Sequence, residues 1–210
     1  MGNPTQTSHR DEARARPNRM IGPQVISPLF VGREEELAVL TELLERALEG
    51  QGSVAVVGGD VGIGKSRLCR ELKARAVGLG ARVIEGRCSP SETTVPFAPF
   101  LDALRFRLRR GEGAEAARVL KPVLAHVAPF FRELEAQAGR GLTPTALPTP
   151  FEPILRVVRL LAETSPIVLL IEDVHWADPT SRDLLLYLAR RIRNERVLLL
   201  ITVRTDELPA

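Results

Sequence analysis

The stretch GGDVGIGKS, residues 58–66, decides the fold expected for this chain. From Gly59 it has the spacing G-x-x-x-x-G-K-S, with the β-branched run SVAVV (53–57) before it and helical leucine spacing after it. Glycines permit positive φ angles, so successive backbone N–H groups can surround an anion in front of the positive end of a helix. The stretch therefore predicts a phosphate-binding loop between a strand and a helix. Its glycines do not fit the dinucleotide fingerprint, which argues against a nicotinamide or flavin site.

A second stretch, IVLLIEDVHWADPTS (167–181), places two carboxylates, Glu172 and Asp173, directly after five apolar residues. A buried charge is costly unless it is paired or coordinates a metal. The plain alternative is that the strand has ended and the acids are solvated. A phosphate loop in the same chain favours the other interpretation, because a phosphate-processing site needs a carboxylate for Mg²⁺ at a neighbouring strand end. A second acid beside it can orient or deprotonate a water.

The composition permits one sizeable α/β domain in 210 residues, with a formal net charge of +3. This mild basicity permits a nucleic-acid partner but does not require one, since no lysine- or arginine-rich block dominates. The cysteines and histidines have neither disulfide-framework nor metal-site spacing; they are Cys69, Cys88, His9, His126 and His175. The N-terminus lacks the apolar core of a signal peptide, and no apolar run is long enough to span a membrane. We therefore expect a cytoplasmic protein without a membrane partner.

Four strands are predicted, at about 53–57, 81–86, 167–171 and 197–203, and helical patterns alternate with them. This alternation predicts an α/β fold with a parallel sheet covered on both faces. The polar residues 1–26 are expected to form a disordered tail. Residues 88–150 are less regular: an amphipathic helix at 97–110, one or two helices broken at prolines, and a loop by composition.

Four segments together resemble AAA-type ATPase domains of the STAND class: FVGREEEL (30–37), GGDVGIGKS (58–66), LLIEDVHWADPTS (169–181) and LLLITVRTDEL (198–208). These domains are similar to origin-recognition ATPases. They occur in large LuxR-type transcriptional regulators and in some multidomain cyclases and kinases. The resemblance covers about residues 29 to 208. It implies a P-loop NTPase fold, a three-layer sandwich with a parallel sheet, in an ATPase domain spanning 27–210.

The resemblance also implies ATP and Mg²⁺ as ligands and assigns roles by position. Lys65 would contact the β- and γ-phosphates, Ser66 and Glu172 would hold Mg²⁺, Asp173 would be the catalytic acid, and Arg204 a sensor of the γ-phosphate. Many members have Asp as the first acid, so the division of roles between Glu172 and Asp173 stays open. The expected nucleotide-binding residues are Val31, Gly32 and Arg33 near the adenine, and Gly59, Asp60, Val61, Gly62, Ile63, Gly64, Lys65, Ser66 and Arg67 around the phosphates.

Other residues receive plainer interpretations. His175 and Trp176 either contact nucleotide or pack in the fold, Asp178 is expected to cap a helix, and Cys69 is expected in the core. Two groups of arginines are expected to be solvated helix faces rather than a nucleic-acid patch; they are Arg105, Arg107, Arg109 and Arg110, and Arg190, Arg191 and Arg193. Direct DNA binding by this segment is therefore not expected.

The predicted function is an ATP-binding, slowly hydrolysing switch module whose nucleotide state sets the conformation of attached domains. The alternatives are a structural nucleotide-binding module without turnover, a DNA-remodelling or initiator ATPase, and, least favoured, a small-molecule kinase. The ATPases that this chain resembles have five central strands and a helical lid, whereas four strands and no lid are predicted here. We therefore expect a C-terminally truncated domain whose partners are the missing lid and effector domains, with self-association as a further expectation. The phosphate-loop strand should then lie at a sheet edge.

Overall fold

The computed structural model describes residues 32–92, 96–109 and 151–206. The chain divides into two compact units, Met1–Gly32 and Arg33–Ala210, and every helix and strand discussed below lies in the second. The predicted N-terminal tail, Val31 and the predicted helices and loop at 110–150 lie outside the described residues.

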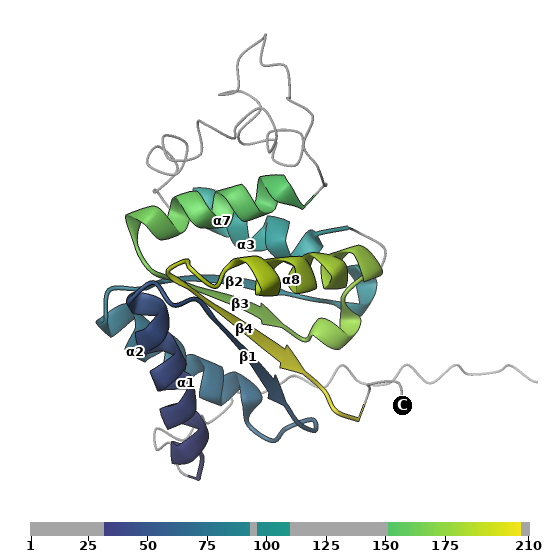
Figure 1. Cartoon of the computed structure of the whole chain (residues 1–210). Coiled ribbons are helices and arrows are strands. Elements are labelled where there is room, and N and C mark those ends of the chain that lie inside the picture. The colour runs from purple at the N-terminus through teal and green to yellow at the C-terminus, as the bar shows by residue number, and fades with distance from the viewer. Residues whose placement is uncertain (1–31, 93–95, 110–150, 207–210) are drawn as a thin grey trace, which may run out of the picture. The chain divides into compact units, whose positions relative to one another are not determined.

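The core of the second unit is a four-stranded sheet whose strands are all parallel. The strands are β1 (Ser53–Gly58), β2 (Arg82–Arg87), β3 (Ile167–Glu172) and β4 (Val197–Val203), and their order across the sheet is β1-β4-β3-β2 (Figure 1). The predicted α/β class and parallel sheet are confirmed, with strand bounds within one residue of those expected.

Burial distinguishes the central strands from the edge strand. Every residue of β3 is buried, as a central parallel strand covered on both faces requires. In β1 buried and exposed residues alternate, and Val54 and Val56 are 38% and 61% exposed. Within the described residues the strand that leads into the phosphate loop therefore lies at the edge of the sheet, as the sequence predicts.

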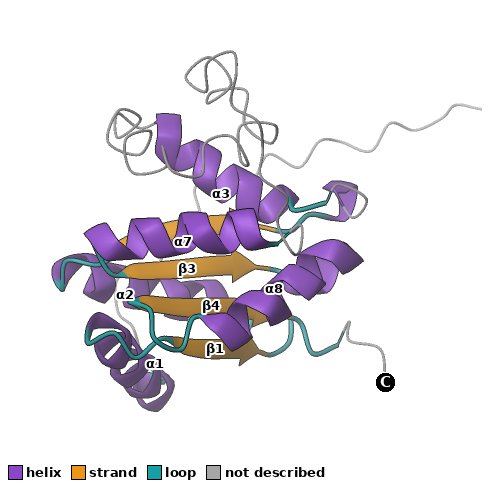
Figure 2. Ribbon diagram, turned by 45° about the horizontal axis from the view of Figure 1, so that its top comes forward, coloured by secondary structure: helices purple, strands orange, loops and turns teal. Residues whose placement is uncertain are grey.

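Helices cover both faces of the sheet, giving three layers (Figure 2). One face carries α1 (Glu34–Leu48) and α2 (Lys65–Gly78). The other carries α3 (Ala98–Arg109), α7 (Glu152–Thr164) and α8 (Pro179–Arg191). No helix of the described residues is long and apolar enough to cross a membrane.

The start of α8 confirms one predicted detail. Asp178 is the N-cap residue: its Oδ1 accepts a hydrogen bond from the Ser181 N–H at 3.0 Å, and Pro179 takes the first helical position. The Ser181 hydroxyl in turn accepts from the N–H of Phe97, which precedes α3 and has φ +63°. This cap thus fixes α8 and the entry to α3 on the same face.

Candidate functional site

Three chain segments meet at the carboxyl end of the sheet, where its parallel strands finish. The phosphate loop follows β1, Asp173 follows β3, and Arg204 follows β4, which lies between those two strands. Because the strands are parallel, their carboxyl ends all lie here, which is where ligands bind in open α/β sheets. The structure therefore brings together the loop, the acid pair and the start of the segment after β4.

The phosphate loop owes its shape to glycine. Gly59, Gly62 and Gly64 have φ angles of +147°, +80° and +96°, which residues with a Cβ rarely adopt. At Gly59 an added Cβ would also lie 3.0 Å from the Cγ2 of Ile63. Gly64 is the N-cap residue of α2 and no side chain caps this helix. The N–H groups of Arg67 and Leu68 bond the Gly64 carbonyl, so the two N–H groups before them, those of Lys65 and Ser66, are the ones that an anion at this helix end can satisfy.

The Lys65 side chain bonds back to the backbone of the phosphate loop. The residue is 9% exposed, and its Nζ donates to the Gly59 carbonyl at 2.6 Å and to the Asp60 carbonyl at 2.9 Å. The ammonium charge is thereby held under the loop. A lysine carries a third N–H donor, so these two bonds leave one donor for an anion in the loop.

The acid pair is held by an arginine that the sequence did not single out. Arg87 ends β2, and its Nη2 lies 2.7 Å from Oε2 of Glu172, which is 5% exposed. Its Nε lies 3.7 Å from Oδ2 of Asp173. The hydrogen bond to Glu172 raises the pKa of Arg87, against the opposing effect of burial. Arg87 and Glu172 are register partners in neighbouring strands, so knowledge of the strand order would have revealed this pair.

The end of β4 connects both flanking segments through three hydrogen bonds. The Thr202 hydroxyl oxygen accepts from the Asp173 N–H at 2.9 Å, and the Arg204 N–H donates to Nδ1 of His175 at 3.3 Å. The Thr205 hydroxyl donates to Oδ1 of Asp60, in the phosphate loop, at 2.9 Å. The sequence predicted a role for Arg204 but missed the two threonines.

The remaining candidates near the acids have structural surroundings. Trp176 packs against the hydrophobic core, which favours packing for this residue. The ring of its neighbour His175 lies 5.3 Å from the Trp176 ring. Cys69 is fully buried, as predicted. Its burial raises the pKa of the thiol to about 12, and the negative charge of Glu172 acts in the same direction. A thiol with that pKa is inert as a nucleophile.

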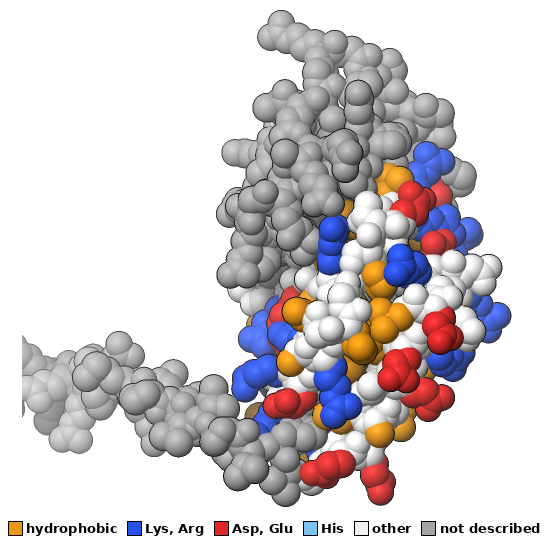
Figure 3. All heavy atoms as spheres, turned by 90° about the vertical axis from the view of Figure 1, so that its left-hand side faces the viewer, with side chains coloured by type: hydrophobic (Ala, Val, Ile, Leu, Met, Phe, Trp, Pro, Cys, Tyr) orange, Lys and Arg blue, Asp and Glu red, His pale blue; other side chains and the backbone are white. Residues whose placement is uncertain are grey.

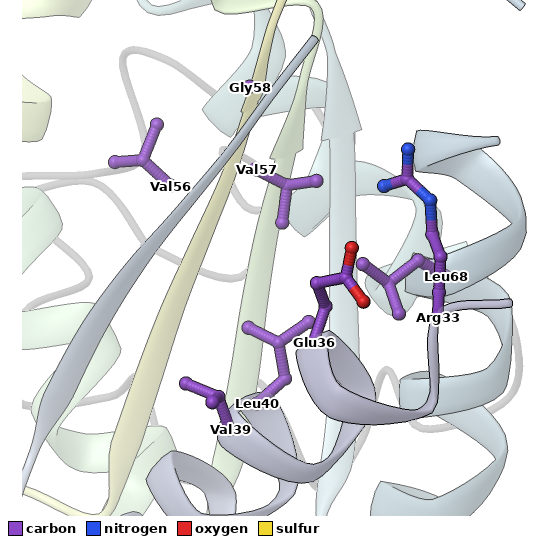
Figure 4. Close-up of a pocket in the computed structure, with 8 residues that line it drawn as sticks. All are labelled: Arg33, Glu36, Val39, Leu40, Val56, Val57, Gly58 and Leu68. Atoms are coloured by element: carbon purple, nitrogen blue, oxygen red, sulfur yellow. The ribbon is translucent and has the colours of Figure 1, made fainter. Parts of the chain in front are cut away.

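A cavity of about 360 Å³ lies between α1, β1 and α2, beside the entry to the phosphate loop. In Figure 4 the side chains of Glu36, Leu40, Val57 and Leu68 converge on this space. Arg33, expected near the adenine, also lines it. Its full lining is Arg33, Glu36, Val39, Leu40, Val56, Val57, Gly58 and Leu68. Of the other two residues expected near the adenine, Val31 lies outside the described residues and Gly32 belongs to the first unit.

The surface charge agrees with the expectation of solvated arginines where it is described. Figure 3 shows basic and acidic side chains interspersed on one face of the molecule. On α8 and after it, Arg190, Arg191 and Arg193 are exposed, and Arg191 lies 4.5 Å from the centre of the Tyr187 ring. The side chains of Arg105, Arg107, Arg109 and Arg110 lie outside the described part of the chain.

Comparison with known proteins agrees with this fold. Residues 29–201 match the model of the AAA ATPase domain family, and the chain therefore belongs to that family. An uncharacterized protein of Rhizobium meliloti (strain 1021), R02095, is 34% identical over 205 residues. That match includes 89% of this chain but 19% of the relative, so the chain spans about a fifth of the relative's length.

Two solved structures are also similar. The crystal structure of Cdc6p from Pyrobaculum aerophilum is 18% identical, with a TM-score of 0.52 over 88% of this chain and 42% of that one. The ORC2 protein of Aeropyrum pernix in its ADP form is 16% identical, with a TM-score of 0.45 over 88% of this chain and 45% of that one. The Cdc6p similarity supports the fold: a four-stranded parallel sheet with helices, of the kind found in P-loop ATPases.

Proposed function

We propose that this chain is an ATP-binding, slowly hydrolysing switch module of the STAND type, within a larger signalling or transcriptional regulator of the LuxR kind. One observation carries the proposal. At the carboxyl end of the sheet, the glycine loop with its buried Lys65 lies on one side of β4, and the carboxylate pair lies on the other side. A cation-lined loop and a carboxylate pair so placed match what phosphoryl transfer needs, namely phosphate positioning and charge neutralisation.

The triphosphate would lie in the loop from Gly59 to Arg67. The uncapped N-terminus of α2 and the remaining donor of Lys65 would face the β- and γ-phosphates. Adenine would lie in or beside the cavity that Arg33 lines, since this cavity borders Gly58 at the entry to the loop.

Mg²⁺ suits the donors present. The Ser66 hydroxyl and the Glu172 carboxylate are hard oxygen ligands, and Mg²⁺ is usually held by one or two carboxylates together with substrate phosphates. When bound, the ion neutralises charge that develops on the transferred phosphoryl group. In the structure the Glu172 carboxylate is paired with Arg87, so a metal ion at Glu172 would compete with the guanidinium for it.

Hydrolysis would use the second acid. Asp173 would orient or deprotonate the attacking water, and Arg204 would sense the γ-phosphate from the segment after β4. A change at the γ-phosphate could then reach the chain beyond β4 through the bonds of Arg204 and Thr205 to the two loops. This connection supports a switch whose nucleotide state is communicated to attached parts.

The length comparison supports a module within a longer protein, because the Rhizobium meliloti relative extends far beyond the matched region. A lid and effector domains on the C-terminal side, ATP and ADP, and self-association are the partners we propose, in the cytoplasm. Direct DNA binding by this segment is not part of the proposal.

ATP turnover by the purified chain tests the proposal. We expect slow Mg²⁺-dependent hydrolysis under single-turnover conditions, together with saturable binding of a fluorescent ATP analogue. Binding without any hydrolysis would favour a structural nucleotide-binding module. Stimulation of turnover by DNA would favour the initiator-type alternative. Absence of binding would overturn the proposal as a whole.

A further inference from the structure

Asp173 has an unusual backbone conformation. Its φ and ψ angles are +57° and +43°, in the left-handed region, which is uncommon for a residue with a side chain. Such a conformation persists only where the surrounding structure determines it, and it is concentrated at functional sites. Contacts from the rest of the fold must therefore hold Asp173 in this conformation.

The left-handed turn changes which way the second carboxylate faces. In a continuing strand, Glu172 and Asp173 would point to opposite faces of the sheet. Instead both carboxylates lie near the same guanidinium, with Arg87 2.7 Å from Glu172 and 3.7 Å from Asp173. The turn at Asp173 therefore cancels the alternation and brings the two acids to one side.

The neighbouring strand supplies the contact that holds this turn. The Asp173 N–H donates to Oγ1 of Thr202 at 2.9 Å, and Thr202 is 2% exposed. Thr202 lies near the end of β4, whose Ile201 is the register partner of Ile171 in β3. On the other side of the turn, the Asp173 carbonyl accepts from the Trp176 N–H at 2.9 Å, closing the short helix η4 (Val174–Trp176). A buried hydroxyl thus fixes the amide at the point where the strand turns.

We propose that Thr202 is a positioning residue: by fixing the backbone amide of Asp173 it sets the position of the Asp173 carboxylate beside Glu172 at the carboxyl end of the sheet. This inference rests on the proposed ATPase function, because it assigns Asp173 the role of orienting the attacking water. The competing explanation is that the hydroxyl merely satisfies a buried N–H and contributes to stability alone.

A threonine-to-valine change separates these explanations. Valine has nearly the shape of threonine but lacks the hydroxyl, so Thr202→Val removes the acceptor and leaves the packing in place. Thr202→Ser keeps the hydroxyl. The matched control is Thr164→Val, because the Thr164 hydroxyl bonds the Leu161 carbonyl at the C-terminal end of α7, just before β3 begins and so at the opposite end of that strand from the site.

Single-turnover and steady-state ATP hydrolysis by the 210-residue chain are measured with nucleotide affinity and thermal stability. We expect Thr202→Val to lower kcat about ten- to hundredfold, as misplacement of a catalytic group does, with KM and analogue affinity unchanged. Thr202→Ser should restore most of the rate, and Thr164→Val should hydrolyse at the wild-type rate. If Thr202→Val does not fold, Thr202→Ala compared with Thr202→Ser gives the same contrast.

The outcomes distinguish this inference from the proposed function. Wild-type hydrolysis with an unchanged kcat in Thr202→Val overturns the positioning role and leaves the ATPase function standing. A lowered kcat that comes with a matching loss of affinity, or that serine does not restore, also overturns it in favour of the structural explanation. A wild-type chain that binds ATP but never hydrolyses it overturns both.

Discussion

The turns after β1 and β3 both enter the left-handed backbone region, but they do so by different means. After β1 the residues that do so, Gly59, Gly62 and Gly64, are glycines, and the loop is completed by Lys65 within the same segment. After β3 it is Asp173, whose side chain opposes this conformation and whose N–H and carboxylate have their partners, Thr202 and Arg87, on other strands. The phosphate loop is thus encoded locally, whereas the acid turn is encoded by the tertiary fold.

The largest expected effect concerns the acid turn. Asp173→Asn should lower turnover at least about a hundredfold, the usual contribution of a general base, while ATP stays bound because the phosphate loop is untouched. Single-turnover hydrolysis and analogue titration measure the two quantities. Glu172→Gln is the companion variant, and it should instead weaken the magnesium-dependent part of binding more. The reverse pattern would exchange the roles of the two acids.

The next effect concerns the phosphate loop. Lys65→Ala removes the charge that faces the β- and γ-phosphates, and charge-assisted contacts contribute about 1.5–3 kcal/mol each, so affinity for ATP should fall roughly tenfold or more. Lys73→Ala is the matched control, because Lys73 lies on the same helix and pairs with Glu85 at 2.6 Å. Equal analogue titrations for wild type and Lys65→Ala would remove the lysine from the site.

The contrast between the locally encoded phosphate loop and the acid turn held by other strands explains which features could be predicted from the sequence. The strand alternation and the G-x-x-x-x-G-K-S spacing were enough to predict the parallel sheet and the loop, because these depend on neighbours in the chain. The edge position of β1 was predicted instead from the family resemblance, because the family's fifth strand is not among the four predicted strands. Arg87 and Thr202 could not be predicted. Each lies in an ordinary strand, and its importance arises only when the order β1-β4-β3-β2 places it beside the acids. Glu36 was missed likewise, because its cavity forms between separate elements.

A smaller effect is expected at Arg87. Arg87→Ala leaves the buried Glu172 carboxylate without its ion-pair partner. We expect the free energy of unfolding to fall by about 1–2 kcal/mol, a modest value because the guanidinium is largely exposed to solvent. Chemical denaturation with and without Mg²⁺ measures this, and Mg²⁺ should stabilise the variant more than wild type.

Arg159→Ala provides the control for Arg87. Arg159 pairs with Glu195 at 2.7 Å, away from the acid pair, so its loss should lower stability without any dependence on Mg²⁺. If Mg²⁺ stabilises Arg87→Ala no more than Arg159→Ala, Arg87 and the ion do not compete for Glu172. Neighbouring strands would then fix the backbone conformation of the acid turn, but Arg87 would not neutralise the carboxylate that binds Mg²⁺.

The smallest effect is expected where the end of β4 contacts the phosphate loop, through the Thr205 hydroxyl and Asp60 at 2.9 Å. Because Thr205 is exposed, Thr205→Val should reduce stability by about 0.5 kcal/mol, the low end for a hydrogen bond. Glycine geometry and Lys65 still shape the loop, so analogue affinity should change less than about threefold, against tenfold or more for Lys65→Ala. The dissociation rate of the nucleotide in stopped flow should rise by a similar small factor, since the loop loses its hydrogen bond to the segment after β4.

Asp60→Asn, which keeps an acceptor oxygen, should behave like wild type. A loss of affinity in Thr205→Val as large as that in Lys65→Ala would mean that the phosphate loop, like the acid turn, is held by a neighbouring strand, and the contrast between the two turns would fail.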